Sequence, residues 1–391
     1  MVCLFLSSFK RLNFRYTCAL SNGQHVLLNQ GRKMKHLFLY CRAGYEKECA
    51  NEIQDKAAEL DFFGFAKAQS NQGYVVFELY EEKAQELLEK LPVFDLIFAR
   101  QMFVAYPLLE DLPQEDRISP IVALLEPSLK AGRLWVETPD TNEAKELSRF
   151  CRKFTVPLRK ALREKGTLLE KEHKKKPTIH VCFVASGCAF VGYSLSSSHS
   201  PYSMGIPRLK MPSDAPSRSV LKLEEAFKHF IPHDERELRL ASGLKSVDLG
   251  ACPGGWTYQL VRHGFFVSAV DHGAMDPALM ETGQVKHFLE DGFKFEPARK
   301  NIYWLVCDMV DKPARVAELI ERWAVEGWFT ESIFNLKLPM KSRYKEVKQV
   351  LETMTQVLHT YGLANFKVVC KHLYHDRDEV TVHLDLRPTK L

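Results

Sequence analysis

The chain has 391 residues, more than a single hydrophobic core usually organises, so two or three domains are expected. Hydrophobic residues make up 46% of the chain and charged residues 26%, which is the balance of an ordinary globular protein and excludes a disordered or fibrous one. The formal net charge of +5 permits a nucleic-acid partner that binds local basic patches, but it does not require one.

The cysteine pattern and the apolar runs bound the setting in which the chain works. The ten cysteines are scattered, and no two of them form a Cys-x-x-Cys pair. This spacing is typical of a reducing compartment and not of a disulfide framework or a zinc site. No apolar run in the sequence approaches the roughly 18 residues that a membrane-spanning helix needs. We therefore expect a cytoplasmic protein with no membrane anchor and no bound metal.

The first 33 residues differ from the rest of the chain. An apolar start precedes Lys10 and Arg11, which reverses the charge order of a secretory signal peptide, and no small-residue cleavage site stands out. A clear strand pattern begins only at Leu37. We expect residues 1–33 to be a disordered or mis-annotated extension and Met34 to be the true start.

Residues 34–110 are expected to form a small α/β unit with the order strand, helix, strand, helix, strand. A helix is predicted over residues 46–60, where Cys49, Ile53, Ala57 and Leu60 recur at helical spacing. The run from Tyr74 to Phe77 is rich in β-forming residues and predicts a strand.

Residues 111–200 are expected to form a second unit. The pattern predicts a helix from Pro120 to Leu129, a strand over residues 134–136, a long helical stretch over residues 142–165, and two strands, 179–184 and 190–195, that pair with each other.

The long helical stretch of this second unit is dense in cations. Such a density indicates a surface that contacts RNA phosphates. A solvated helix face without a partner is the alternative, because charge runs are common on exposed helices. The candidate RNA-binding residues are Arg149, Arg152, Lys153, Arg159 and Lys160.

Residues 201–391 are expected to form a doubly wound, Rossmann-like α/β domain. A serine- and proline-rich stretch from Ser194 to Pro216 marks a linker or active-site loop in front of it. Strand candidates then alternate with helical segments, which predicts a mainly parallel sheet. The last two candidates lie close together and suit an antiparallel edge hairpin. The strand candidates are residues 246–249, 266–270, 303–307, 333–336, 366–370 and 380–384.

The strongest motif is the run Asp-Leu-Gly-Ala-Cys-Pro-Gly-Gly-Trp from Asp248 to Trp256, between the first strand of this domain and a helix. Glycines at such a turn let the backbone pass close to a ligand, at the crevice where open α/β sheets bind their ligands. A nicotinamide fingerprint requires glycine two places after Gly250, where this chain has Cys252, so a dehydrogenase is disfavoured. A tight turn without a ligand is the structural alternative.

This run closely resembles motif I of the FtsJ-like methyltransferases, which bind S-adenosylmethionine. The resemblance implies that cofactor, and acids follow the later strands where such a fold uses them. Asp271 ends the second strand and is suited to accept hydrogen bonds from ribose hydroxyls. Asp291 lies where the family contacts adenine. Asp308 ends the next long strand, near the methyl donor. Any one of these acids alone could be a loop cap.

FtsJ-like enzymes use a Lys-Asp-Lys-Glu tetrad, and this sequence has Lys222, Asp308, Lys337 and Glu379 at the matching places. The resemblance implies that Lys337 accepts a proton from a ribose 2′-hydroxyl, that Lys222 and Glu379 orient it and the ribose, and that Asp308 shapes the electrostatics. As isolated residues, each would more often be a surface charge. Neighbouring carboxylates favour protonated lysine, whereas a base must be neutral.

Two other targets for the methyl group are disfavoured. Enzymes that methylate exocyclic amines typically carry Asn/Asp-Pro-Pro-Tyr/Phe where this chain has Asp-Met-Val-Asp at residues 308–311. Methylation at cytosine C5 needs a catalytic cysteine, but Cys307 lies inside a predicted strand and is expected to pack there. A ribose oxygen is the favoured target, with base methylation as an alternative.

From Met34 to about Arg387 the sequence closely resembles the bacterial large-subunit rRNA 2′-O-methyltransferases of the RlmM type. The resemblance rests on residues 42–49, 140–143, 149–154, 204–210 and 334–341. It implies a ferredoxin-like lead-in at 34–110, a THUMP module at 111–200 and a methyltransferase domain at 201–391. It also implies methylation of a cytidine ribose in 23S rRNA or a large-subunit precursor. A non-catalytic, RNA-binding ribosome-assembly factor with the same fold is the rival interpretation.

The same resemblance implies which residues contact S-adenosylmethionine. They are Ser219, Cys252, Pro253, Gly254, Gly255, Asp271, Asp291 and Asp308.

Overall fold

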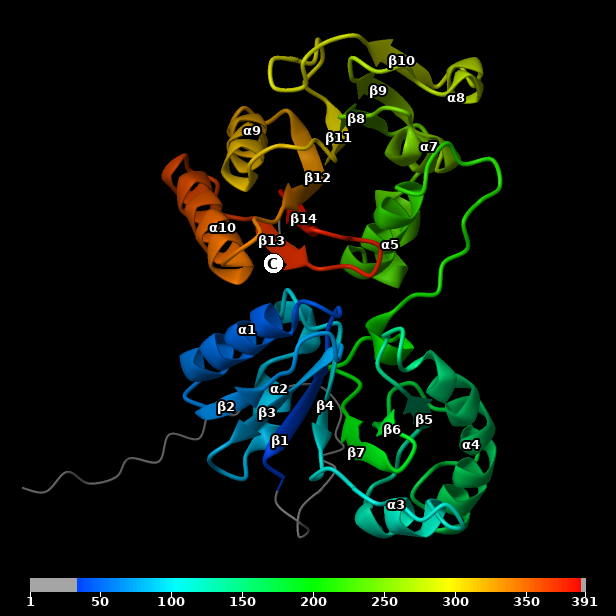
Figure 1. Cartoon of the computed structure of the whole chain (residues 1–391). Helices are drawn as coiled ribbons and strands as arrows, with labels where there is room; N and C mark the ends of the chain where they lie inside the picture. Colours follow the sequence, from blue (N-terminus) through cyan, green and yellow to red (C-terminus); the bar gives the residue numbers. More distant parts are fainter. Residues whose placement is uncertain (1–33, 388–391) are drawn as a thin grey trace, which may run out of the picture. The chain divides into compact units, whose positions relative to one another are not determined.

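The computed structural model describes residues 34–387, so the expectations for residues 1–33 lie outside the described residues (Figure 1). Its strands form two seven-stranded sheets, which are separate in sequence. This arrangement confirms the α/β fold class. Among residues 34–387, no helix has the length and apolar character needed to cross a membrane.

The N-terminal sheet has the strand order β2-β3-β1-β4-β7-β6-β5. Its strands are β1 (His36–Tyr40), β2 (Gly64–Lys67), β3 (Tyr74–Leu79), β4 (Gln101–Ala105), β5 (Arg133–Glu137), β6 (Thr178–Ala185) and β7 (Cys188–Ser194). Its helices are α1 (Glu46–Glu59), α2 (Ala84–Lys90), α3 (Ile118–Leu124) and α4 (Lys145–Glu164), with 3₁₀ turns η1 (Val93–Asp95) and η2 (Ser203–Gly205).

One antiparallel contact, between β4 and β7, joins the strands of the two predicted N-terminal units into this single sheet. Gly192 of β7 pairs with Ala105 of β4. A Cβ at Gly192 would lie 1.8 Å from the carbonyl oxygen of Val104, so only glycine allows the strands to meet here.

The C-terminal sheet has the strand order β10-β9-β8-β11-β12-β14-β13. The strands β10, β9, β8, β11 and β12 run parallel to one another, and β14 runs antiparallel to both of its neighbours, β12 and β13. Its strands are β8 (Lys245–Leu249), β9 (Phe266–Val270), β10 (Val285–Phe288), β11 (Ile302–Cys307), β12 (Phe329–Lys337), β13 (Lys367–Lys371) and β14 (Glu379–Asp385). Its helices are α5 (Val220–Phe230), α6 (Arg236–Arg239), α7 (Gly255–Arg262), α8 (Pro277–Glu281), α9 (Pro313–Val325) and α10 (Arg343–Thr360), with a 3₁₀ turn η3 (His233–Glu235).

Helices cover both faces of the C-terminal sheet, as expected for a doubly wound domain (Figure 1). Leu305 and Cys307 of β11 belong to the core that includes α9 and α10. Trp304 and Val306 of the same strand belong to the core that includes α5 and α7. Because successive side chains of a strand point to opposite faces, the apolar strand β11 contributes side chains to the hydrophobic cores on both faces of the sheet. Cys307 is fully buried, which confirms its predicted packing role.

The structure corrects three details of the sequence reading. The helix predicted to reach Leu129 ends at Leu124, since Pro127 disfavours helical backbone at the preceding residue. Strands β2 and β10 were not predicted. Each has only four residues and lies at the edge of its sheet. Because an edge strand is only partly buried, its sequence shows a weak apolar pattern.

Candidate active site

The turn after β8 carries the glycine-rich motif and opens helix α7. Gly254 has φ of 120°, a conformation that side chains with a Cβ rarely adopt. A Cβ there would also lie 2.4 Å from the side chain of Leu279. The first turn of α7 therefore presents bare backbone at the carboxyl edge of the sheet, where open α/β sheets bind their ligands.

The predicted cofactor-contacting residues lie along this edge. Asp271, directly after β9, accepts hydrogen bonds from the backbone nitrogens of Cys252 at 2.9 Å and Gly273 at 2.8 Å. Asp271 thus ties the motif loop, with its exposed Cys252 and Pro253, to the end of β9. The Ser219 hydroxyl lies beside Gly255, because a Cβ at Gly255 would be 2.0 Å from that oxygen.

Asp291 follows β10 and accepts a hydrogen bond from the backbone nitrogen of Phe293 at 2.9 Å. The neighbouring Gly292 lies against Met309, where a Cβ would be 2.6 Å from the sulfur. The Asp291 loop is therefore packed beside the residue that follows Asp308. The three predicted acids accordingly follow three strands of one sheet at the same edge.

The four residues of the predicted tetrad meet in one cluster. Asp308 accepts hydrogen bonds from Lys337 Nζ at 2.9 Å, through Oδ1, and from Lys222 Nζ at 3.4 Å, through Oδ2. Glu379 lies 2.5 Å from Lys222 Nζ and 3.7 Å from Lys337 Nζ. Both ammonium groups are therefore bridged by the same two carboxylates.

The sheet topology explains how distant residues meet. β14 inserts antiparallel beside β12, with Lys337 directly opposite Glu379 in the register. Asp308 follows β11, the strand on the other side of β12, and Lys222 comes from α5. Side chains opposite each other in antiparallel strands lie within contact distance, so the register alone fixes the pair of Lys337 and Glu379.

The cluster is partly buried, and its charges stabilise one another. Burial lowers the pKa of Lys222, but Asp308 and Glu379 outweigh that effect and the pKa lies above its usual value. Burial raises the pKa of Asp308, but the two lysines outweigh it and the pKa lies below its usual value. Asp308 is therefore ionised at neutral pH and Lys222 is charged.

Asn335 and Thr381, which the sequence analysis did not single out, support the tetrad from inside the sheet. Asn335 Nδ2 donates to Asp308 Oδ1 at 2.8 Å. Thr381 Oγ1 lies 2.9 Å from Asn335 Oδ1 and 3.0 Å from both carboxyl oxygens of Asp376. Burial raises the pKa of Asp376 well above its usual value, with a further rise from Glu225 and Glu379.

Thr381 is the central link in this chain of hydrogen bonds. Its Oγ1 has the amide oxygen of Asn335 and the Asp376 carboxyl group as acceptors. The amide nitrogen must then face Asp308. Asn335 and Thr381 are cross-strand partners in β12 and β14, and both are fully buried. Both strands carry several other polar residues, so no sequence pattern singles these two out.

The predicted RNA-binding residues lie on α4. This helix connects two strands of the N-terminal sheet, whereas the tetrad belongs to the C-terminal domain. Arg149, Arg152, Lys153 and Lys160 are exposed, and Arg159 is half-buried. The only ion pair of these five among the described residues is a loose one, 3.9 Å from Lys160 Nζ to Glu164. Their charges are thus available to a partner.

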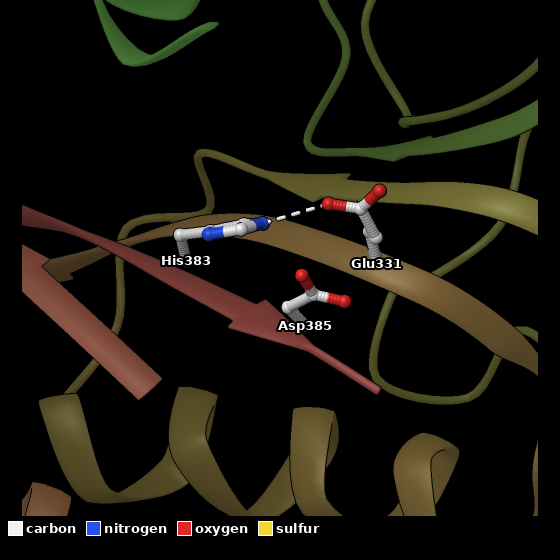
Figure 2. Close-up of side chains that lie close together, drawn as sticks. All are labelled: Glu331, His383 and Asp385. Atoms are coloured by element: carbon white, nitrogen blue, oxygen red, sulfur yellow. Dashed lines mark hydrogen bonds and ion pairs between the residues drawn. The ribbon is translucent and has the colours of Figure 1, made fainter. Parts of the chain in front are cut away.

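A second polar cluster lies inside the C-terminal sheet, made of Glu331, His383 and Asp385 (Figure 2). Its carboxylate oxygens could in principle hold a metal ion. However, Glu331 already accepts from Arg239 Nε at 2.9 Å and from His383 Nε2 at 2.9 Å, and Asp385 accepts from Arg387 Nη2 at 2.7 Å. Arginine side chains therefore already neutralise these carboxylates, and the cluster is an internal ion-pair network.

An open, mostly parallel sheet with a glycine-rich first turn, and with acids after three of its strands, defines a Rossmann-like methyltransferase domain. The family matches agree with this class. Residues 215–383 match the FtsJ-like methyltransferase family, residues 34–103 the RlmM ferredoxin-like domain, and residues 116–195 the N-terminal region of ribosomal RNA large subunit methyltransferase M.

Proteins from Shewanella baltica strain OS185 and Shewanella putrefaciens strain CN-32 are each 68% identical to this chain over 356 residues. Both are named ribosomal RNA large subunit methyltransferase M, and the alignments cover 91% of this chain and 99% of each relative. The chain belongs to the ribosomal RNA large subunit methyltransferase M family, which confirms the predicted resemblance.

Among solved structures, TrmN from Thermus thermophilus is 14% identical with a TM-score of 0.33, covering 90% of this chain and 99% of its own. That similarity is too distant to bear on the function. The matches do not name a THUMP module, so the THUMP assignment of residues 111–200 stays a prediction.

Proposed function

We propose that this methyltransferase transfers a methyl group from S-adenosylmethionine to the ribose 2′-hydroxyl of a cytidine in 23S rRNA or a large-subunit precursor. The observation that carries the proposal is the cluster in which Asp308 and Glu379 bridge Lys222 and Lys337 at the carboxyl edge of the sheet. The names of the 68% identical relatives support rRNA as the substrate. A cytoplasmic location is part of the same proposal, because the substrate is there.

The residues at the sheet edge fit S-adenosylmethionine. Asp291 uses only one carboxylate oxygen in the described structure, and Asp248 has a buried Oδ1 without a hydrogen-bond partner. These unpaired carboxyl oxygens suit a ligand that carries hydroxyl and amino groups. Ser219 and residues 252–255 supply the backbone and hydroxyl groups around the α7 terminus. S-adenosylmethionine supplies a methyl group activated by a sulfonium leaving group.

The chain's own residues perform the remaining work. Lys337 acts in its neutral amine form: Nζ takes the proton of the 2′-hydroxyl and becomes an ammonium, while the oxygen gains the methyl group and the bond from that methyl to sulfur breaks. Lys337 is the more exposed of the two lysines, with 21% of its side chain accessible against 15% for Lys222. Lys222 and Glu379 hold Lys337 and the ribose in place, and Asp308 fixes both ammonium groups. Much of the acceleration in such a displacement comes from positioning of this kind.

Two alternative functions are distinguished from this proposal by experiment. One is a non-catalytic RNA-binding assembly factor, and the other is a base methyltransferase. The domain limits also stay proposals: a ferredoxin-like lead-in at 34–110, an RNA-binding unit at 111–200 and the catalytic domain at 201–391.

We predict that Lys337→Met lowers turnover by about 10²- to 10⁴-fold, the usual contribution of a general base. Affinity for RNA and for S-adenosylmethionine should change by only a few-fold. The measurement is single-turnover methyl transfer to rRNA from cells that lack the protein, with equilibrium binding of both ligands. Lys345→Met, an exposed lysine on α10, is the matched control. Near-normal turnover in Lys337→Met would remove Lys337 from the chemistry.

A further inference from the structure

A cavity of about 540 Å³ opens directly beside the tetrad. It is lined by residues of the N-terminal sheet region, such as Arg42 and Arg100, and by residues of the catalytic domain, such as Arg218 and Arg377. Lys222 and Glu379 of the tetrad belong to the same lining. The volume lies within the usual range for a site that holds a small ligand or a single nucleotide.

Positive charge dominates this cavity. Its lining has four arginines. The lining carboxyl groups outside the tetrad are Asp140 and Asp376, and burial raises the pKa of Asp376 well above its usual value. Asp140 is itself engaged by Arg208 at 3.4 Å. Among residues 34–387, the guanidinium groups of Arg218 and Arg377 have no hydrogen bond or ion pair, and both residues are exposed.

The inner wall contains buried groups that lack partners. Arg100 is 5% exposed and its Nε has no hydrogen-bond partner, although its Nη2 donates to the carbonyl of Leu373 at 3.2 Å. The Nε2 atom of His375 is also buried and unpartnered. Burial lowers the pKa of His375 to about 4, and the charges of Arg218, Arg100 and Arg42 lower it further. All three arginines line the same cavity as this imidazole. Glu225 and Asp140 attract the charge of Arg100, but burial outweighs them and lowers its pKa, so a ligand anion in the cavity would stabilise this cation further.

We propose that this cavity binds phosphodiester groups of the RNA strand next to the acceptor nucleotide, through Arg218 and Arg377 at its mouth and Arg100 on its wall. Planar guanidinium groups suit phosphate because they donate two parallel hydrogen bonds. The N-terminal region and the catalytic domain then hold the substrate jointly, in addition to the α4 surface. The inference rests on the proposed function, because it places the bound strand beside Lys337.

The test is binding of a short fluorescein-labelled single-stranded RNA to the full-length chain, followed by anisotropy across a salt series. The double variant Arg218→Gln with Arg377→Gln should bind about ten-fold more weakly or worse. Its plot of log affinity against log salt should be shallower by about 1.4, which corresponds to two lost phosphate contacts on a single strand. Arg299→Gln, an exposed arginine before β11 at the opposite edge of the sheet, should match the wild type.

A second RNA, with uncharged methylphosphonate at its central linkages, tests the contact directly. The wild type should lose affinity for it, and the double variant should lose clearly less. Equal losses, or an unchanged salt slope in the double variant, would overturn the proposal. A poly-glutamate peptide that binds the wild type as tightly as RNA, and loses that binding in the double variant, would instead assign the cavity to acidic protein segments.

The readout is binding, so it is independent of methyl transfer. Failure to find a methylated ribose would contradict the proposed function and leave this cavity test valid. Unchanged RNA affinity in an enzyme that does methylate ribose would overturn the cavity proposal alone.

Discussion

At the scale of single residues, the tetrad shows what a motif can predict and what it cannot. The resemblance to FtsJ-like enzymes identified Lys222, Asp308, Lys337 and Glu379, and the described structure brings all four together. Nothing in the spacing of the sequence reveals that Asn335 supports them. That contact depends on the register of β12 with β14, which long-range pairing decides.

Asp248, the first residue of the glycine-rich motif, gives a pH-dependent prediction. Burial raises its pKa from 3.8 to about 7, even though Thr257 donates a hydrogen bond to it at 2.6 Å. The folded state therefore holds this proton more tightly than the unfolded state does. Its contribution to stability is complete below pH 3.8 and is lost as the pH rises through 7.

We expect the stability of Asp248→Asn relative to wild type to increase by a few kcal/mol between about pH 4 and pH 8. Urea unfolding at a series of pH values measures this difference, and other buried carboxyls cancel because both proteins contain them. Asp234→Asn, at an exposed position, should show no such trend. A difference that does not vary with pH would mean that Asp248 is already ionised in the folded protein.

At the scale of elements, the parallel strands were predictable and the short edge strands were not. The strands β9 and β11 are largely apolar runs bounded by turn residues, which a sequence pattern reveals, and β8 leads directly into the glycine-rich motif. The strands β2 and β10 are held by their neighbours in the sheet. Helix α4 was predicted over residues 142–165 and is observed over Lys145–Glu164, with Cys151, Leu158 and Leu162 on its buried side.

The exposed face of α4 gives the prediction at this scale. Arg152→Glu with Lys153→Glu should weaken RNA binding at least about ten-fold and flatten its salt dependence, because phosphate contacts are replaced by repulsion. Anisotropy with labelled rRNA fragments gives both quantities. Arg299→Glu with Lys367→Glu reverses the same number of exposed charges elsewhere and serves as control. Equal behaviour of the two double variants would leave α4 as a solvated helix face.

At the scale of the whole molecule, the sequence predicted a catalytic domain behind N-terminal units but not how those units join. The single sheet that spans residues 36–194 depends on the β4–β7 pairing, which connects segments far apart in the chain. No local pattern encodes such a contact, because loop length and tertiary packing decide it.

A buried lysine connects the two sheets. Lys371 of β13 donates to the carbonyls of Val93 and Leu96, each at 2.5 Å, and Glu52 of α1 accepts from the backbone of Phe98 at 2.8 Å. Burial lowers the pKa of Lys371 and raises that of Glu52, while their mutual attraction opposes both shifts. The segment from Val93 to Phe98 is thus held from both sides.

Lys371→Met should destabilise the protein by about 3 kcal/mol, since two buried carbonyls lose their donor and Glu52 loses a counter-charge. Urea unfolding followed by tryptophan fluorescence measures the loss. Lys367→Met, at an exposed position of the same strand, should stay within about 0.5 kcal/mol of wild type. If both variants unfold alike, the buried lysine does not hold the two sheets together.

The central claim is that the clustered lysines and carboxylates direct a methyl group to a ribose oxygen. The most direct measurement is to methylate rRNA from cells lacking the protein with labelled S-adenosylmethionine, digest the RNA to nucleosides and identify the labelled product. We predict a single labelled nucleoside, 2′-O-methylcytidine, that is absent with Lys337→Met. Label on a base, or an equal yield of methylated ribose from the variant, would contradict the account.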